Sequence, residues 1–187
     1  SDLFNSYVIE CEKVIRRAKN LEDDIQKLFS EEFGVNAYET PISQISLNKN
    51  IHYRYDRKLD AEVKIARFQS ETLSGLLSYY IGIAMGRFSL NEEGVVYANT
   101  GGAKFTISDS ESRPFTFVAD EDGIIPLASE EWLFDDDATT RFKEFVKTVW
   151  GDEHLSENLE FVAESLCLHS LKPKKGESAM DTIRRYF

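Results

Sequence analysis

The sequence predicts a mainly α-helical protein of the α+β class. We expect a long N-terminal arm helix and a helical body that carries a small antiparallel β-hairpin or a three-stranded sheet. Apolar residues recur every three or four positions in several stretches, as in amphipathic helices. Between residues 94 and 127 the pattern changes to short β-branched and aromatic runs, which favour strands. Hydrophobic residues make up 42% of the chain, which indicates a packed core.

Residues 2–33 are expected to form one helix that packs along a partner. Gly34 follows them and is typical of the residue that ends a helix. A helix of about thirty residues spans roughly 45 Å. We therefore divide the chain into a helical arm, residues 1–34, and a mostly helical body, residues 35–187, with a β insert near residues 94–127. The apolar seam of the arm comprises Phe4, Val8, Cys11, Ile15, Ala18, Leu21, Ile25 and Leu28.

A second long helix is expected over Ala61–Phe88. Its apolar positions widen toward the C-terminal end until most of its faces are apolar, which is typical of a helix inside a core. Three glycines in it would let neighbouring elements approach closely. They are Gly75, Gly82 and Gly86. The segment before this helix, His52–Lys58, has weak strand character.

The β insert is predicted from three short runs. Val95–Tyr97 and Lys104–Ile107 flank Asn99–Gly102, which is a plausible hairpin turn. Phe115–Val118 is the candidate third strand, and the acidic residues of Asp120–Gly123 end it.

The remaining chain is predicted to be helical. Asp137 and Ser156 are each expected to cap a helix, and a last helix starts near Ser178. Residues Thr182–Phe187 end inside an amphipathic pattern, so we expect that the chain belongs to something longer.

Charge and cysteine content restrict the class of protein. The 187 residues carry a net charge of −11, so duplex DNA repels the chain unless its basic residues gather on one face. Cys11 and Cys167 are too few for a disulfide framework, and we expect them as thiols in the cytoplasm. The most apolar stretch, Leu73–Met85, is shorter than the ~20 residues of a membrane helix. We therefore expect no membrane association. No basic and apolar leader stands at the start of the sequence, so we expect that nothing in it directs secretion.

Two acidic motifs resemble metal sites only in part. With Gly123 at the sixth position of a calcium loop, Val118 and Ser129 fall where carboxylates are required, so we expect a solvated turn. Asp135–Asp137 precede a helix, where negative charge complements the helix dipole. We favour that explanation over a Mg²⁺ site.

The sequence contains no motif for catalysis or for cofactor binding. It has no Gly-x-Gly, no Gly-Lys-Ser/Thr and no Gly-x-Ser-x-Gly. The three histidines and two cysteines are too scattered for a metal centre. We therefore assign no catalytic, cofactor-binding or metal-binding residue.

The best local candidate for nucleic-acid contact is a basic and aromatic stretch that begins at Lys49. The residues chosen as possible contacts to the DNA backbone are Arg54, Arg57, Lys58, Lys64 and Arg67. A half-buried strand whose arginines pair with the chain's many acids explains the same pattern equally well. A second basic group, between Lys172 and Arg185, leaves the same two alternatives.

Several blocks resemble the PglX-type adenine-specific DNA methyltransferases of BREX phage-defence systems. The blocks are Leu21–Phe33, Tyr79–Tyr97, Phe117–Phe134 and Ser178–Phe187. They cover most of the chain in the family's order, and the second and third are the specific ones. The resemblance implies an interior segment between the methyltransferase core and the target-recognition part.

The resemblance also implies that the parent protein transfers a methyl group from S-adenosylmethionine to N6 of adenine in DNA. Such enzymes need a glycine-rich cofactor turn and an Asn/Asp-Pro-Pro-aromatic motif that holds the flipped base. The chain has neither motif, and its four prolines are never adjacent. The cofactor and the catalytic residues are therefore expected elsewhere in the parent.

Three roles follow from these expectations. The first is a non-catalytic spacer that positions the catalytic core relative to the target-recognition part. The second is a module that contacts the DNA backbone, which the net charge of −11 disfavours for the segment alone. The third is a docking module for another component of the defence system or for a phage inhibitor. The third role predicts an exposed apolar patch with an acidic rim.

Overall fold

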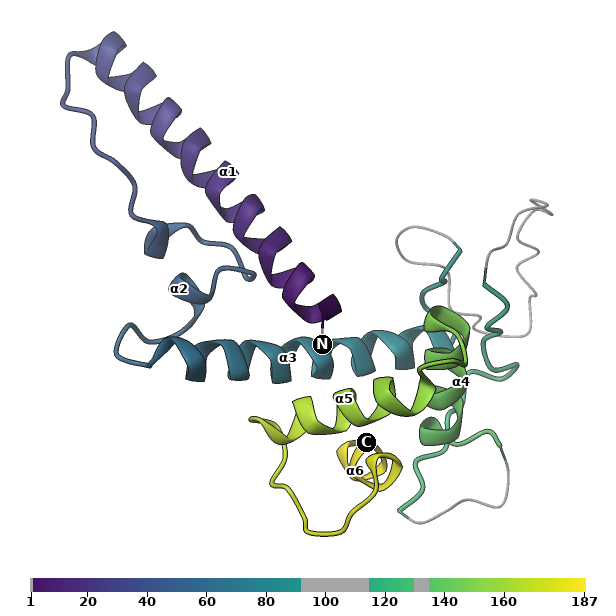
Figure 1. The fold of residues 1–187 in the computed structure, drawn as a ribbon. Coiled ribbons are helices and arrows are strands. Elements are labelled where there is room, and N and C mark those ends of the chain that lie inside the picture. Colours follow the sequence, from purple (N-terminus) through teal and green to yellow (C-terminus); the bar gives the residue numbers. More distant parts are fainter. Residues whose placement is uncertain (1, 92–114, 130–134) are drawn as a thin grey trace. The chain divides into compact units, whose positions relative to one another are not determined.

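The structure is a computed structural model that describes residues 2–91, 115–129 and 135–187. These residues form helices only, and no strand occurs among them. The chain divides into two compact units, Ser1–Gln69 and Ser70–Phe187, which are described separately. In chain order the helices are α1 (Asp2–Phe33), the 3-10 turn η1 (Ile42–Gln44), α2 (Ile51–Arg54), α3 (Ala61–Ala84), α4 (Ala138–Trp150), α5 (Leu155–Cys167) and α6 (Ala179–Tyr186) (Figure 1).

The predicted α+β class is wrong for the described residues. The candidate third strand, Phe115–Val118, is not a strand. The side chain of Asn91 accepts a hydrogen bond from the Phe115 N–H at 3.2 Å and donates one to the Phe115 carbonyl at 3.0 Å, in place of a neighbouring strand. The ring of Phe117 packs against Tyr80 and Phe145. Aromatic rings of α3 and α4 therefore hold this segment. The predicted hairpin, residues 95–107, lies outside the described residues.

The first predicted helix is confirmed by α1. It ends at Gly34, whose φ of 64° lies in the left-handed region. The Gly34 N–H donates to the Ser30 carbonyl at 3.0 Å, which satisfies one of the carbonyls left free at the helix end. The predicted boundary after residue 34 thus follows the end of α1, and the arm as a separate domain stays a prediction.

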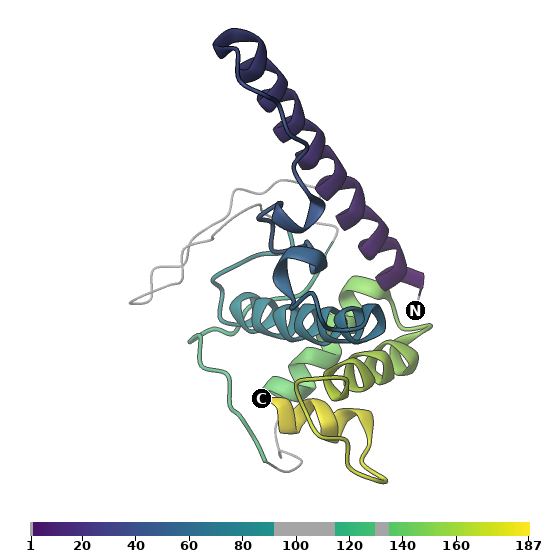
Figure 2. The same cartoon turned by 90° about the vertical axis from the view of Figure 1, so that its left-hand side faces the viewer.

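The first unit buries only part of the predicted seam of α1. Phe4, Cys11 and Ile15 are buried, and the Phe4 and Tyr7 rings lie 6.3 and 6.1 Å from Phe68. Ile45, which directly follows η1, and Tyr55 are also buried. Val8 and Ala18 of the seam are half-buried, and Leu21, Ile25 and Leu28 are exposed. The segment that follows Gly34 runs back along α1 (Figures 1 and 2).

The expected strand character of His52–Lys58 is also wrong. The helix α2 occupies its first residues, because Asn50 caps that helix with its side-chain oxygen, which accepts from the His52 N–H at 3.1 Å. The amide nitrogen of Asn50 donates to the carbonyls of Ile42 and Ile45 at 2.7 and 2.9 Å. Asn50 is fully buried. Local capping therefore outweighs the strand preference of the neighbouring tyrosines.

The second predicted helix is confirmed as α3, but it ends at Ala84 and not at Phe88. Gly86 has a φ of 76°, and its N–H donates to the Ile83 carbonyl at 2.9 Å. The Arg87 N–H donates to the Gly82 carbonyl at 2.7 Å, which completes a Schellman motif. The chain then folds back so that the Phe88 ring covers Gly82. A Cβ atom at Gly82 would lie 2.4 Å from that ring.

The second unit packs around Tyr80 of α3. Its hydroxyl donates to the Ala138 carbonyl at 2.8 Å, and its ring lies 5.1 and 5.4 Å from the rings of Phe142 and Phe145 in α4. Burial raises the pKa of Tyr80 well above its ordinary value, so the phenol stays a hydrogen-bond donor. Helices α5 and α6 complete this core with Leu159, Val162, Leu166 and Ile183 (Figure 2).

One of the two predicted caps, Asp137, and the predicted helix start near Ser178 are confirmed. The Asp137 carboxylate accepts from the N–H groups of Thr139 and Thr140 at 2.9 and 3.3 Å. The Ser178 hydroxyl accepts from the Asp181 N–H at 3.1 Å. The prediction for Ser156 is wrong, since α5 begins one residue earlier and its hydroxyl donates to Glu160 instead. Within the described parts, no helix has the length and apolarity needed to cross a bilayer.

Candidate nucleic-acid interface

The five predicted DNA-contact residues all belong to the first unit. Arg54 ends α2, Arg57 and Lys58 lie in the turn that follows it, and Lys64 and Arg67 lie in the first turns of α3. The side chains of Arg54, Arg57 and Lys58 are exposed, and Arg67 is half-buried. Lys64 is buried, so it presents the least surface to a phosphate.

Arg54 and Arg67 meet at one aromatic ring. The guanidinium carbon of Arg54 lies 5.7 Å from the centre of the Tyr55 ring, and that of Arg67 lies 5.2 Å from it. The attraction between a guanidinium group and an aromatic face orients both arginines. Arg54 also donates to the Asn48 carbonyl at 3.3 Å. The structure thus brings together two of the predicted residues on a buried tyrosine.

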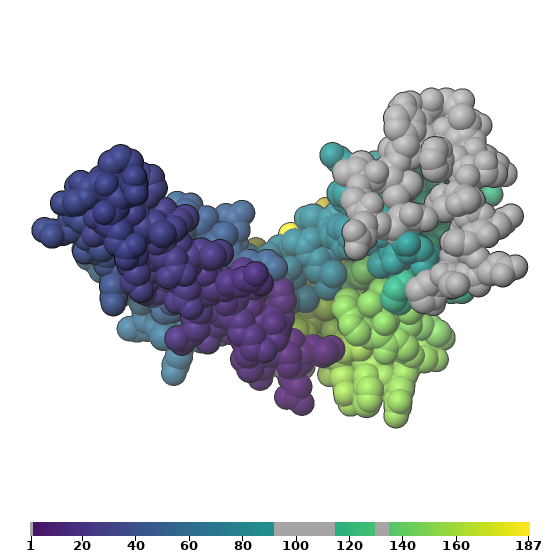
Figure 3. Space-filling view, turned by 90° about the horizontal axis from the view of Figure 1, so that it is seen from above, coloured from purple at the N-terminus to yellow at the C-terminus, as the bar shows by residue number. Residues whose placement is uncertain are grey.

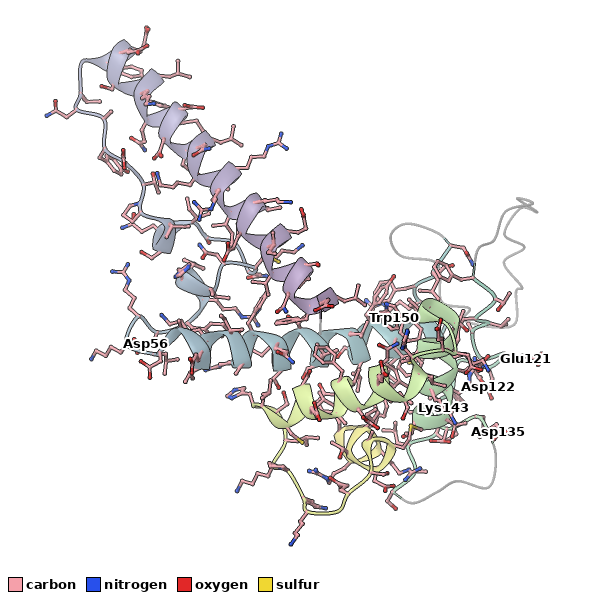
Figure 4. All side chains as sticks on the ribbon, viewed as in Figure 1. Asp56, Glu121, Asp122, Asp135, Lys143 and Trp150 are labelled. Atoms are coloured by element: carbon pink, nitrogen blue, oxygen red, sulfur yellow. The ribbon has the colours of Figure 1, made fainter. Side chains whose placement is uncertain are left out.

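Arg57 and Lys58 are placed differently. Arg57 donates to the Ser43 hydroxyl at 3.2 Å. The Asp56 carboxylate accepts from the Lys58 backbone N–H at 2.9 Å and closes the turn. Asp56 is exposed beside them (Figure 4), so a carboxylate reduces the positive charge of this turn. The contact of these five residues with DNA stays a prediction.

Sequence reasoning placed Tyr55 in the basic and aromatic stretch without identifying its role, and it did not single out Asn50. Asn50 positions α2, and Tyr55 holds the two arginines. The signal for Asn50 was present, because asparagine is among the favoured residues just before a helix. The signal for Tyr55 was not, because a ring contacted by Arg67 depends on how α3 packs. Lys49 extends the surface, with its Nζ 5.6 Å from the centre of the Tyr7 ring.

The second basic group, in the second unit, is largely paired. Arg185 donates to both carboxylate oxygens of Glu177, at 2.9 and 2.6 Å, and to the Lys172 carbonyl at 3.1 Å. Arg184 donates to Asp181 at 2.6 Å. The hydrogen bonds from Arg185 lower the pKa of the Glu177 carboxyl. Arg185 therefore fastens the loop before α6 to that helix, whereas Arg184 pairs within the helix.

The acidic motifs behave as local structural features. The Asp120 carboxylate accepts from the N–H groups of Asp122 and Gly123, both at 3.1 Å. Glu121, Asp122 and Asp135 are exposed (Figure 4). Across residues 2–91, 115–129 and 135–187, no group of three His, Cys, Asp or Glu side chains is arranged to hold a metal ion.

Comparison with known proteins identifies relatives of this chain. No protein-family model matches it. It is 49% identical over 185 residues to a protein named "Adenine-specific methyltransferase BrxX" from Escherichia coli (strain HS). It is 29% identical over 185 residues to "Adenine-specific methyltransferase PglX" from Lacticaseibacillus casei (strain Zhang).

These matches span 97 and 98% of this chain but only 15 and 13% of the relatives. The resemblance predicted from the sequence blocks is thereby confirmed. The chain corresponds to a segment of the PglX-type family, which includes the adenine-specific methyltransferases BrxX and PglX.

Proposed function

We propose that this chain is a non-catalytic spacer of a DNA N6-adenine methyltransferase in a BREX phage-defence system. It would lie between the catalytic core, which binds S-adenosylmethionine, and the target-recognition part, and it would set their separation. The observation that carries the proposal is the match over nearly the whole chain to adenine-specific methyltransferases. The chain itself lacks the cofactor and base-binding motifs of such enzymes.

The length of α1 supports a spacer. Its 32 residues span roughly 48 Å at about 1.5 Å per residue, and a helix of this length keeps its two ends at a fixed distance. Capping at Gly34 fixes where the helix stops. A spacer of this kind is useful only if it remains straight.

Breaking α1 tests the spacer. In the full-length methyltransferase that carries this segment, Lys27→Pro removes one helical hydrogen bond at an exposed position and costs about 3 kcal/mol of helix stability. We expect site-specific adenine methylation to fall at least tenfold while binding of S-adenosylmethionine, measured by calorimetry, is unchanged. Lys27→Ala is the matched control, because it keeps the helix. Full methylation by the proline variant rejects the spacer.

The paired arginines at Tyr55 favour contact with the DNA backbone as a second candidate function. Two guanidinium groups held on one ring form a preorganised pair of phosphate donors. Fluorescence anisotropy of the full-length protein with a short duplex tests this function. The Arg54→Ala/Arg67→Ala double variant should bind more weakly, with a smaller dependence on salt. Lys143→Ala, which removes an exposed lysine of α4 in the other unit, is the control. Equal affinity and equal salt dependence reject the contact.

A further inference from the structure

The C-terminal half of α1 carries an exposed apolar stripe. Val14, Leu21, Ile25 and Leu28 expose 49, 56, 47 and 64% of their surface, and Ala18 lies between them half-buried. We call these five residues the α1 stripe. Their steps along the chain are four, three, four and three residues, which is the spacing of a seam between two packed helices.

Beyond Ile15, the rest of the first unit covers a different face of α1. The segment that returns along the helix is held by Asp23, whose carboxylate accepts from the Thr40 N–H at 2.8 Å. Ser30 fastens the same segment by donating to the Val35 carbonyl at 2.6 Å. Asp23 lies two residues from both Leu21 and Ile25, and two residues turn a helix by roughly 200°. The returning segment therefore lies opposite the stripe and leaves it open.

The charged residues beside the stripe are mostly acidic. In the heptad repeat of the stripe, the flanking positions hold Ile15, which is buried, Arg17, Glu22, Asp24, Phe29 and Glu31. The four charged side chains are exposed. Charges at flanking positions select the partner helix, because opposite charges across the seam attract and like charges repel. One arginine against three carboxylates favours a partner with basic flanks.

We propose that the α1 stripe is the docking site of an amphipathic helix with aliphatic residues in the same repeat and Lys or Arg beside them. The helix would come from the remainder of the longer methyltransferase polypeptide, and to that extent the inference rests on the proposed function. The chain spans only 15 and 13% of its two relatives, so most of their surface lies outside it. A second copy fits less well, because it brings the same three flanking carboxylates and a net charge of −11.

Cysteine labelling tests whether the stripe is covered. Leu21→Cys and Leu28→Cys are made in a Cys167→Ser background, since Cys11 is buried. Maleimide labelling is measured in this chain alone and in the full-length protein, with circular dichroism as a check of helix content. We expect labelling at both stripe positions to be at least tenfold slower in the full-length protein. Asn20→Cys, exposed on another face of α1, should label equally in both. Equal labelling of the stripe in both proteins overturns the proposal.

Two synthetic peptides test the partner's chemistry. Both carry leucine in the heptad seam, and they differ only in lysine or glutamate at the flanking positions. The lysine peptide should bind this chain with at least a tenfold lower Kd than the glutamate peptide. Its binding should weaken at least tenfold in Leu21→Ser/Leu28→Ser, and should not change in Val35→Ser, which alters an exposed apolar residue outside the stripe. Equal affinity for both peptides overturns the proposed chemistry.

Sedimentation velocity distinguishes the source of the helix. A concentration-dependent dimer that Leu21→Ser/Leu28→Ser abolishes would make a second copy the occupant and overturn the proposal. The labelling result is also independent of the Lys27→Pro experiment. Protection of the stripe together with full methylation by Lys27→Pro rejects the spacer and keeps the docking site. Equal labelling of the stripe in both proteins, together with reduced methylation by Lys27→Pro, keeps the spacer and rejects the docking site.

Discussion

Tyr80 in the second unit lies within 6.3 Å of four aromatic rings, those of Phe117, Phe142, Phe145 and Phe187. The first unit has a smaller cluster, in which the rings of Phe4 and Tyr7 lie 6.3 and 6.1 Å from that of Phe68. It buries a few side chains of α1, and a polar residue, Asn50, ties its turns together. The second unit is thus stabilised mainly by apolar burial, and the first depends more on directed hydrogen bonds. Substitutions in the two units should therefore destabilise the protein in different ways.

The largest effect is expected in the aromatic core. Phe142→Ala removes a fully buried ring and leaves a cavity, so it should lower the free energy of unfolding by about 3–5 kcal/mol. Chemical denaturation measures it. Phe33→Ala, which truncates an exposed ring of the first unit, should cost under about 0.5 kcal/mol. Equal costs at the two positions would remove the contrast between the units.

Asn50→Ala is the corresponding test of the first unit. It removes the two side-chain hydrogen bonds to the carbonyls of Ile42 and Ile45 and the cap of α2, so a loss of about 1–3 kcal/mol is expected. Hydrogen exchange should show faster opening of residues 42–55, with unchanged protection in α5. Asn48→Ala, at an exposed neighbour, is the control. Uniform loss of protection in both units would contradict a local role for Asn50.

The cap of α4 should have a smaller effect. Asp137→Ala leaves two N–H groups at the start of α4 without their acceptor and should cost about 1 kcal/mol. Asp135→Ala, two residues earlier and exposed, should be nearly neutral. Thermal melts of the two variants measure the difference. A similar loss in both would mean that general negative charge near α4, and not the cap, is responsible.

The smallest effect concerns pH. Arg185 lowers the pKa of Glu177 in the folded protein, so the carboxylate binds fewer protons there than in the unfolded chain. The resulting stability is present above the ordinary carboxyl pKa and is lost as the pH falls through the lowered value. Melts between pH 7 and pH 3 should show a weaker acid dependence for Glu177→Gln than for the unchanged protein. Identical acid dependence would exclude this contribution.

The helices that local chemistry determines were predictable from the sequence. The spacing of apolar residues and Gly34 located α1, and Asp137 and Ser178 located the starts of α4 and α6. Each of these signals depends on residues within one or two turns. Ser156 shows the limit of such reasoning, because a serine inside the first turn has the same composition signal as a cap, yet its hydroxyl donates to Glu160 instead.

The structural features that the sequence did not predict depend on contacts between residues that are distant in the sequence. Phe115–Val118 alternates like a strand, but Asn91 and the ring of Tyr80 determine its course. For the candidate DNA contacts, the sequence predicted the residue types but not that Lys64 is buried or that two arginines share Tyr55. The sequence pattern alone does not show which basic side chains become buried when the chain folds.

The contact between Phe88 and Gly82 has an evolutionary consequence. A side chain at position 82 would overlap the ring, so substitution of that glycine requires either that the ring of Phe88 move or that position 88 hold a smaller residue. The two positions should therefore change together across related proteins and rarely alone. Because the ring reaches Gly82 only through the turn at Gly86, that turn should persist wherever the pair does. We therefore expect Gly82, Gly86 and Phe88 to be kept or replaced together in related proteins.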